Sequence, residues 1–241
     1  MKKSLIIPLL SLLFAFSAYS ETAEEVLKKV EAKQNEAKDA EITVKITTIE
    51  KDGTQKTKEG IIYQKGEEKR VFKFTSPADI KGLAVLSTGK DTRFIYLPEF
   101  KKVRRIAGHI KNQSFGGTDF TNDEISSTKY SDDYDAVDLK EADGVKTLTL
   151  KKKTNSDREF DRIVVEVTSD YIIKKAEMYK GDKLNKVLTV SNINKHGKYT
   201  IGEKMEMKDV IKDHSTVMEF TKIEFDKGLS DDIFTERFLK K

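Results

Sequence analysis

The chain has 241 residues, of which 45 are Lys or Arg, 41 are Asp or Glu and none is Cys. A net charge of +4 on so many ionisable residues argues against a nucleic-acid-binding protein, which needs a basic face or arm. Without cysteine, neither a disulfide nor a thiolate metal site can stabilise the fold, so an apolar core must do so.

The first twenty residues have the pattern of a secretory signal peptide. Two lysines precede an apolar run from Leu5 to Phe16, and Ala18 and Ser20 stand at the small-residue positions before a cleavage site. A membrane anchor is the weaker alternative, because the run is shorter than the roughly 20 residues that span a bilayer and Pro8 interrupts it. We expect cleavage after Ser20, export to the periplasm, and a mature chain, residues 21–241, that forms a single domain.

Two segments near the ends of the mature chain predict helices. Residues 23–38 place apolar side chains near helical spacing, with charged residues between them. Thr22 and Glu25 have the spacing of a capping box, in which each side chain binds the other residue's backbone amide. Near the C-terminus, Ser230 is followed by acidic residues and predicts the cap of a short helix.

Most of the remaining chain alternates apolar and polar residues, as strands with one buried face require. Ile42, Val44 and Ile46 alternate with polar residues, and Asp52-Gly53 is a hairpin signal. Ten or more strands spaced about 8 to 12 residues apart indicate a large curved antiparallel sheet or barrel. The predicted strands cover residues 42–47, 60–64, 72–76, 82–86, 94–97, 102–106, 134–140, 148–152, 163–168, 172–179, 184–192, 205–211 and 216–225.

The strand pattern is interrupted between residues 107 and 127. Thr121 and Glu124 repeat the capping-box spacing, Gly116 and Gly117 allow unusual backbone conformations, and Phe115 and Phe120 can anchor the segment in a core. The segment is either a covering loop with two aromatic plugs or a lid that lifts from a cavity. Both interpretations require the same apolar faces, so the sequence leaves them open.

A basic run precedes this segment. Lys101 and Lys102 suit a charged sheet edge that discourages aggregation. Arg104 and Arg105 are neighbours on a predicted strand, so one of them should point to the covered face and fasten the segment through carbonyl groups or Asp119.

The chain offers no recognisable catalytic or metal-binding pattern. His109, His196 and His214 lie far apart and outside any ligand spacing, which favours scattered surface histidines. No GxSxG motif accompanies the serines, and the acidic residues 132–138 lack the glycine and distal glutamate of a calcium loop. We therefore predict no enzyme, no cofactor and no metal.

Several ordered motifs resemble one known family. FTSPADIKG, IYLP followed by KKVRRI, FGGTDFTNDEI and the distant MKDV, HSTVMEF and GLSDDIFTERFL are similar to the outer membrane lipoprotein-sorting proteins of the LolA and LolB superfamily, in a divergent branch. The resemblance covers nearly the whole mature chain. It implies a mainly β protein in which an unclosed antiparallel barrel with an N-terminal helix and a short helical lid encloses an apolar cavity. The family's motif positions fall on Pro77, Gly82, Pro98, Arg104, Arg105, Phe115, Gly116, Thr118, Asp119 and Phe120.

The expected function is that of a periplasmic carrier for lipid or acylated lipoprotein cargo. The carrier would be a monomer that meets an inner-membrane transporter or an outer-membrane acceptor and binds no nucleic acid. A sensor that recognises a protein partner or a mislocalised lipoprotein is the alternative. Arg104, Arg105 and Asp119 are expected to fasten the lid. The residues expected to line the cavity or form the lid are Phe72, Phe74, Leu86, Phe94, Tyr96, Phe115, Gly116, Gly117, Phe120 and Ile125.

Overall fold

A computed structural model describes residues 21–89, 92–126 and 129–241, so the predicted signal peptide, residues 1–20, lies outside the described part of the chain. The described strands form one 13-stranded sheet in the order β6-β5-β4-β3-β2-β1-β13-β12-β11-β10-β9-β8-β7. The strands are β1 (Asp39–Ile49), β2 (Gln55–Lys65), β3 (Lys69–Ser76), β4 (Ala84–Thr88), β5 (Arg93–Leu97), β6 (Lys102–Arg105), β7 (Tyr134–Ala142), β8 (Val145–Lys152), β9 (Arg162–Val167), β10 (Ile173–Lys180), β11 (Lys183–His196), β12 (Tyr199–Asp209) and β13 (His214–Phe225).

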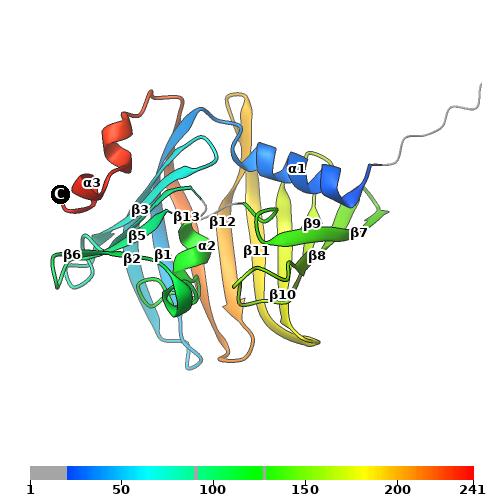
Figure 1. Cartoon of the computed structure of the whole chain (residues 1–241), viewed down its shortest axis with the longest axis horizontal. Coiled ribbons are helices and arrows are strands. Elements are labelled where there is room, and N and C mark those ends of the chain that lie inside the picture. Colours follow the sequence, from blue (N-terminus) through cyan, green and yellow to red (C-terminus); the bar gives the residue numbers. More distant parts are fainter. Residues whose placement is uncertain (1–20, 90–91, 127–128) are drawn as a thin grey trace, which may run out of the picture.

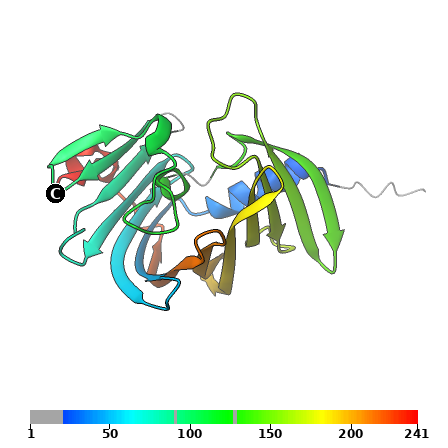
Figure 2. The ribbon, with the colours of Figure 1, turned by 90° about the horizontal axis from the view of Figure 1, so that it is seen from below.

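The sheet bends into an open trough, with β6 and β7 at its two rims (Figures 1 and 2). Each pair of neighbouring strands is antiparallel, and the two rim strands do not pair with each other. In β1, Val44 and Ile46 are fully buried on the concave face while the residues between them are more exposed, which is the predicted alternation. The structure confirms the predicted unclosed antiparallel barrel.

Helix α1 (Ala23–Gln34) lies against β7 and β8 and crosses one end of the trough (Figure 1). The predicted capping box is present: the Glu25 amide donates to the Thr22 hydroxyl over 3.2 Å, and the Thr22 amide donates to Glu25 Oε2 over 2.8 Å. The helix is four residues shorter than predicted. It ends where Asn35 caps it by donating from its side chain to the Glu31 carbonyl over 2.7 Å.

The segment after β6 folds into the mouth of the trough. It contains a short 3-10 helix, η1 (Gly108–Ile110), and helix α2 (Asn122–Ser126), which packs against β3 and β4. The predicted second capping box is also present, with Thr121 N to Glu124 Oε2 at 2.7 Å and Glu124 N to Thr121 Oγ1 at 3.1 Å. This segment is hereafter called the cover segment, residues 107–126.

The C-terminal residues cover the outer face of the sheet. They form η2 (Asp231–Phe234) and α3 (Glu236–Leu239), and the Ser230 hydroxyl accepts from the Asp232 amide as its cap, as predicted. Leu229, Phe234 and Leu239 are buried there against the outward-facing residues of β3 and β4. The short strands β3 to β5 are consequently buried on both faces.

Candidate ligand-binding groove

The concave face of the sheet contains two adjoining cavities. One, of about 170 Å³, lies under the cover segment, and the other, of about 200 Å³, lies near the C-terminal end of α1. Because the two cavities share lining residues, they form one groove along the trough. The shared residues are Gln34, Ile62, Arg70, Ile173, Val190 and Met205.

The wall of the groove under the cover segment is rich in methionine. Every methionine of the chain except Met1 lines this cavity, and these residues come from three strands: Met178 from β10, Met205 and Met207 from β12, and Met218 from β13. Methionine is unbranched and polarizable, so it adapts its shape to varied apolar partners. A wall of this kind can accommodate flexible hydrocarbon chains of more than one length.

Two of the predicted cover residues, Phe120 and Ile125, line this cavity. Phe115 instead fills the core beside it, because its ring packs against Phe72 at 5.1 Å and Phe74 at 5.0 Å between centroids. These three rings are fully buried and line neither cavity. The three phenylalanines thus form a core cluster, whereas Phe120 and Ile125 border the cavity.

The two predicted glycines lie in the turn between Phe115 and Thr118. Gly116 and Gly117 have φ angles of +60° and +70°, in the left-handed region that favours glycine. A Cβ atom on Gly116 would stand 2.5 Å from Cε2 of Phe74, so no side chain fits there without moving the aromatic cluster. The turn is therefore shaped by both backbone conformation and close packing.

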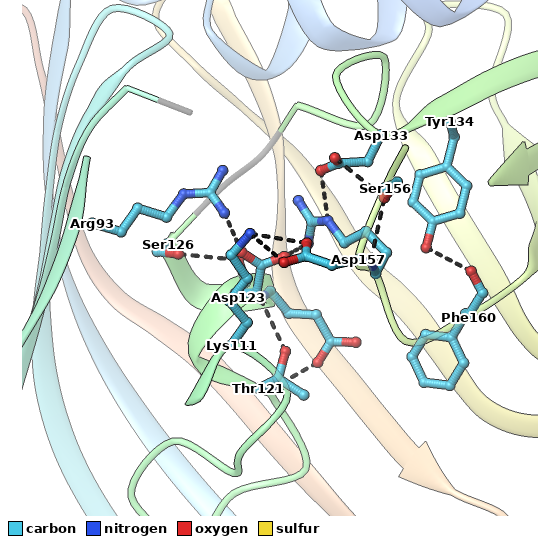
Figure 3. Close-up of polar contacts among 12 residues, drawn as sticks. Arg93, Lys111, Thr121, Asp123, Ser126, Asp133, Tyr134, Ser156, Asp157 and Phe160 are labelled. Carbon is cyan, nitrogen blue, oxygen red and sulfur yellow. Dashed lines mark hydrogen bonds and ion pairs between the residues drawn. The ribbon is translucent and has the colours of Figure 1, made fainter. Parts of the chain in front are cut away.

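Helix α2 is fastened to both sides of the trough by Asp123. Arg93 on β5 forms an ion pair with this carboxylate, as Figure 3 shows. Arg158, in the loop between β8 and β9, forms a second ion pair with it. Arg158 also donates from Nε to Asp133 Oδ2 over 2.7 Å. Asp123 and Arg93 are almost fully buried, so these contacts operate in a low dielectric environment. The cover segment is held by charge as well as by apolar packing.

Asp119, four residues before Asp123, anchors the cover segment to β13. Its carboxylate accepts from the Thr216 hydroxyl over 2.8 Å and lies 2.6 Å from Nδ1 of His214, while Lys186 donates to its carbonyl over 2.7 Å. Burial raises the pKa of the Asp119 carboxyl, and the contacts with Thr216 and His214 oppose that shift. The predicted anchoring role of Asp119 therefore has a structural basis, although its partners are not the predicted arginines. His214 consequently takes part in a buried contact instead of lying free on the surface.

Arg104 is the cross-strand neighbour of the inward-facing Ile95, and Arg105 is that of the outward-facing Phe94, so one arginine of the pair lies on the inner face, as alternation along a strand predicts. Both side chains are nevertheless exposed on the rim strand β6, where only Val103 is partly covered, and neither arginine lines a cavity of the groove.

Two arginines that were not predicted, Arg70 on β3 and Arg93 on β5, lie on the inner face in more covered positions than Arg104. The sequence contained a signal for them, because residues two apart on a strand point to the same face. Arg70 is two residues from Phe72, and Arg93 is two residues from Ile95.

Leu86, Phe94 and Tyr96 also differ from their predicted positions. They face the outer side of the sheet, where they belong to the cluster covered by the C-terminal helices, and they line neither cavity. The reason is that β4 and β5 carry apolar residues on both faces, so apolar character alone does not identify the inner one. Val85 and Ile95 occupy the inner face instead.

The described residues contain no group of three His, Asp or Glu side chains that could hold a metal ion. Within the same part of the chain, no helix is both long and apolar enough to span a membrane.

Comparison with solved structures identifies the same fold in three proteins. A domain from Vibrio parahaemolyticus that is named for outer membrane lipoprotein sorting is 24% identical, with a TM-score of 0.78. A DUF1329 family protein from Desulfovibrio piger is 23% identical with a TM-score of 0.80, and a LolA superfamily protein from Nitrosomonas europaea is 20% identical with a TM-score of 0.74. Each alignment covers 91% of this chain and 100% of the other.

A search of curated proteins found no match. A family model described as "Uncharacterized protein" matches residues 66–241. The chain therefore belongs to the family that this model describes, and its fold is LolA-like, as the sequence motifs predicted.

Proposed function

We propose that this protein is a periplasmic carrier that holds the acyl chains of a lipid or lipoprotein in the groove and performs no chemistry on them. The methionine-lined cavity beneath the cover segment is the observation that carries the proposal. The apolar groove supplies the binding energy, and the cover segment shields the bound chain from water. The names of the similar structures, two of which refer to lipoprotein sorting or to LolA, are consistent with this activity.

A carrier must release its cargo as well as bind it. Burying one methylene group contributes about 0.8 kcal/mol, so a long acyl chain gains on the order of 10 kcal/mol before any cost is subtracted. The side chains that already occupy the groove reduce this gain, because the ligand must displace Phe120 and Ile125 from their apolar contacts. We expect the cover segment to act as an internal competitor that keeps binding reversible.

The test uses the mature chain, residues 21–241, purified from its native compartment. Organic extraction followed by mass spectrometry should recover bound lipid, and the delipidated protein should bind a fluorescent fatty acid. Met205→Gln, which places an amide in the groove wall, should weaken that binding by about tenfold, the equivalent of about 1.4 kcal/mol. Val137→Gln is the matched control, because Val137 is 55% exposed on β7.

Absence of lipid from the native material together with no binding of the fatty acid would overturn the proposal. If a stable protein partner copurified in place of lipid, the sensor alternative would be supported. The proposed export can be checked in the same preparation, because N-terminal sequencing should find Glu21 as the first residue, and a single cooperative unfolding transition would support the proposed single domain. Glu21 is then poised to contact Tyr171, whose hydroxyl donates to Glu21 Oε1 over 2.7 Å.

A further inference from the structure

Arg70 lies on the floor of the groove at the point where the two cavities meet. It belongs to a row of polar residues on the concave face, because Gln64, Arg70, Ser87 and Arg93 are direct cross-strand neighbours on β2, β3, β4 and β5. The row therefore contains two inward-facing arginines separated by one strand. Arg93 is buried and lines neither cavity, whereas Arg70 lines both, and the two also differ in the presence of a carboxylate partner.

Arg93 has its counter-charge from within the protein, whereas Arg70 does not. The Arg93 guanidinium pairs with Asp123. The Arg70 guanidinium makes one hydrogen bond among the described residues, from Nη1 to Oε1 of Gln64 over 2.6 Å, and its buried Nε–H donates to nothing there. Gln64 is neutral, and it is held in place by its own donation to Asn35 Oδ1 over 2.8 Å.

The charge on Arg70 persists at neutral pH. Burial lowers the pKa of its guanidinium to about 10, which still leaves the group protonated at pH 7. Arg70 is half-buried, and a charge that is partly removed from water without an oppositely charged partner opposes folding. The protein thus retains an uncompensated cation at the centre of an apolar groove.

The other charged groups of the groove show that Arg70 is an exception. Each of them, within the described residues, has an oppositely charged partner or accepts from backbone amides. The pairs are Asp123 with Arg158, Glu124 with Lys186, Glu159 with Lys180, Lys33 with Glu36 and Lys129 with Glu67, and Asp39 accepts from the amides of residues 227–229.

From this arrangement we propose that Arg70 binds the anionic group of an amphiphile whose hydrocarbon chain lies in the groove. The inference rests on the proposed carrier function and specifies its ligand as a carboxylate- or phosphate-bearing lipid. The guanidinium presents Nε–H and an Nη–H on one side, a fork that matches two oxygens of a carboxylate or phosphate. An acyl chain attached through an ester or amide carries no charge at that point and would leave Arg70 unpaired.

The experiment measures displacement of a neutral fluorescent probe, N-phenyl-1-naphthylamine, from the delipidated mature protein. The competitors are dodecanoate, dodecyl phosphate, methyl dodecanoate and inorganic phosphate. We expect the anionic amphiphiles to bind at least about tenfold more tightly than the methyl ester, because charge-assisted hydrogen bonds contribute enough binding free energy for a tenfold difference in affinity. Whichever of dodecanoate and dodecyl phosphate binds more tightly identifies the source of the anion, and inorganic phosphate should not displace the probe.

Arg70→Gln should abolish this preference by weakening anion binding while the affinity for methyl dodecanoate stays within about twofold. Arg70→Lys keeps the charge without the fork and should retain part of the preference. Arg237→Gln, which changes an exposed arginine on α3 at the outer side of the sheet, is the matched control and should change nothing. If Arg70 had a purely structural role, Arg70→Gln should melt at a lower temperature than the wild type. If Arg70 is an unpaired cation kept for ligand binding, the ligand-free variant should melt at the same or a higher temperature.

If the wild type bound the ester and the two anions with equal affinity, the inference about Arg70 would be overturned, but the proposed acyl-carrier function would still stand. An anion preference that survives in Arg70→Gln would overturn it as well. If no amphiphile displaced the probe, the carrier function would fail and the inference with it.

Discussion

Arg93 on β5 and Asp123 on α2 form an almost fully buried ion pair that joins the sheet to the cover segment. Asp123 also pairs with Arg158, which lies in the loop between β8 and β9, near the other rim of the sheet. A single carboxylate therefore connects the cover segment to two parts of the sheet that are distant in strand order. Any movement of α2 away from the groove must break both contacts.

Asp123→Asn should destabilise the protein by about 3 to 5 kcal/mol, because the substitution leaves Arg93 buried without a counter-charge. Urea unfolding monitored by circular dichroism measures this loss. We also expect faster exchange of a bound fluorescent fatty acid, since the cover segment loses its connection to both walls.

The matched control is Asp157→Asn, which removes the same charge from an ion pair with Lys111 in which the Asp157 side chain is 56% exposed. Exposed pairs contribute about 0 to 1 kcal/mol, so this variant should unfold nearly as the wild type does. Similar small losses in both variants would show that the buried pair does not hold the cover segment.

Phe115 and Phe120 should respond differently to truncation. Phe115→Ala should cost about 3 to 5 kcal/mol of stability, because the ring is surrounded by Phe72 and Phe74. Phe120→Ala should cost less, because one side of its ring borders the cavity and has fewer neighbours.

Phe120→Ala should also bind the fluorescent fatty acid more tightly than the wild type, since it removes a side chain that competes with the ligand for the groove. A combined series of urea melts and ligand titrations separates the two effects. Unchanged affinity in Phe120→Ala would exclude this residue as a competitor for the ligand.

Gly116→Ala should be more damaging than Gly53→Ala. Both glycines have a positive φ, so each substitution carries about 1 to 3 kcal/mol of backbone strain. Only at Gly116 would the new Cβ also meet the Phe74 ring, whereas nothing lies within 4 Å of the position at Gly53. The difference between the two melting temperatures therefore measures the packing contact.

A double-mutant cycle tests the cause of that difference. Phe74→Leu shortens the side chain that the new Cβ would meet, so it should be less destabilising in the Gly116→Ala background than in the wild type. Additive effects of the two substitutions would show that the strain at Gly116 comes from the backbone alone.

Alkaline pH should weaken the fold through Tyr130, which borders the groove. Removal from water, reinforced by the negative charge of Glu124, raises the pKa of its phenol to about 12, against about 10 in an unfolded chain. Below pH 10 the phenol is neutral in both states and contributes no pH dependence. Between about pH 10 and 12 the unfolded state ionises first, so the stability of the native state falls.

Unfolding midpoints of the wild type and Tyr130→Phe at pH 7 and at about pH 11 measure this contribution. The variant should lose less stability between the two pH values than the wild type, and tyrosinate absorbance should show one fewer late-titrating phenol. Equal losses in the two proteins would assign the alkaline sensitivity to other groups. Tyr134, whose pKa is also raised by burial, provides a second site for the same comparison.

The sequence by itself determined the local structure and the fold class. Capping pairs such as Thr22 with Glu25 and Thr121 with Glu124 act over three residues, so their outcome depends little on distant parts of the chain. Alternation of apolar residues fixed the strands, and the ordered motifs identified the unclosed barrel, which the structure confirms.

Only the tertiary structure decided which faces and which charges form the site. Leu86 and Phe94 face outward because the C-terminal helices, more than 130 residues away in sequence, cover that side of the sheet. Asp123 meets Arg93 and Arg158 through the curvature of the trough, and no local spacing encodes that meeting. The alternation of side chains along β3 is enough to place Arg70 on the inner face. Its lack of an oppositely charged partner depends on every element that surrounds the groove, so only the tertiary structure reveals it.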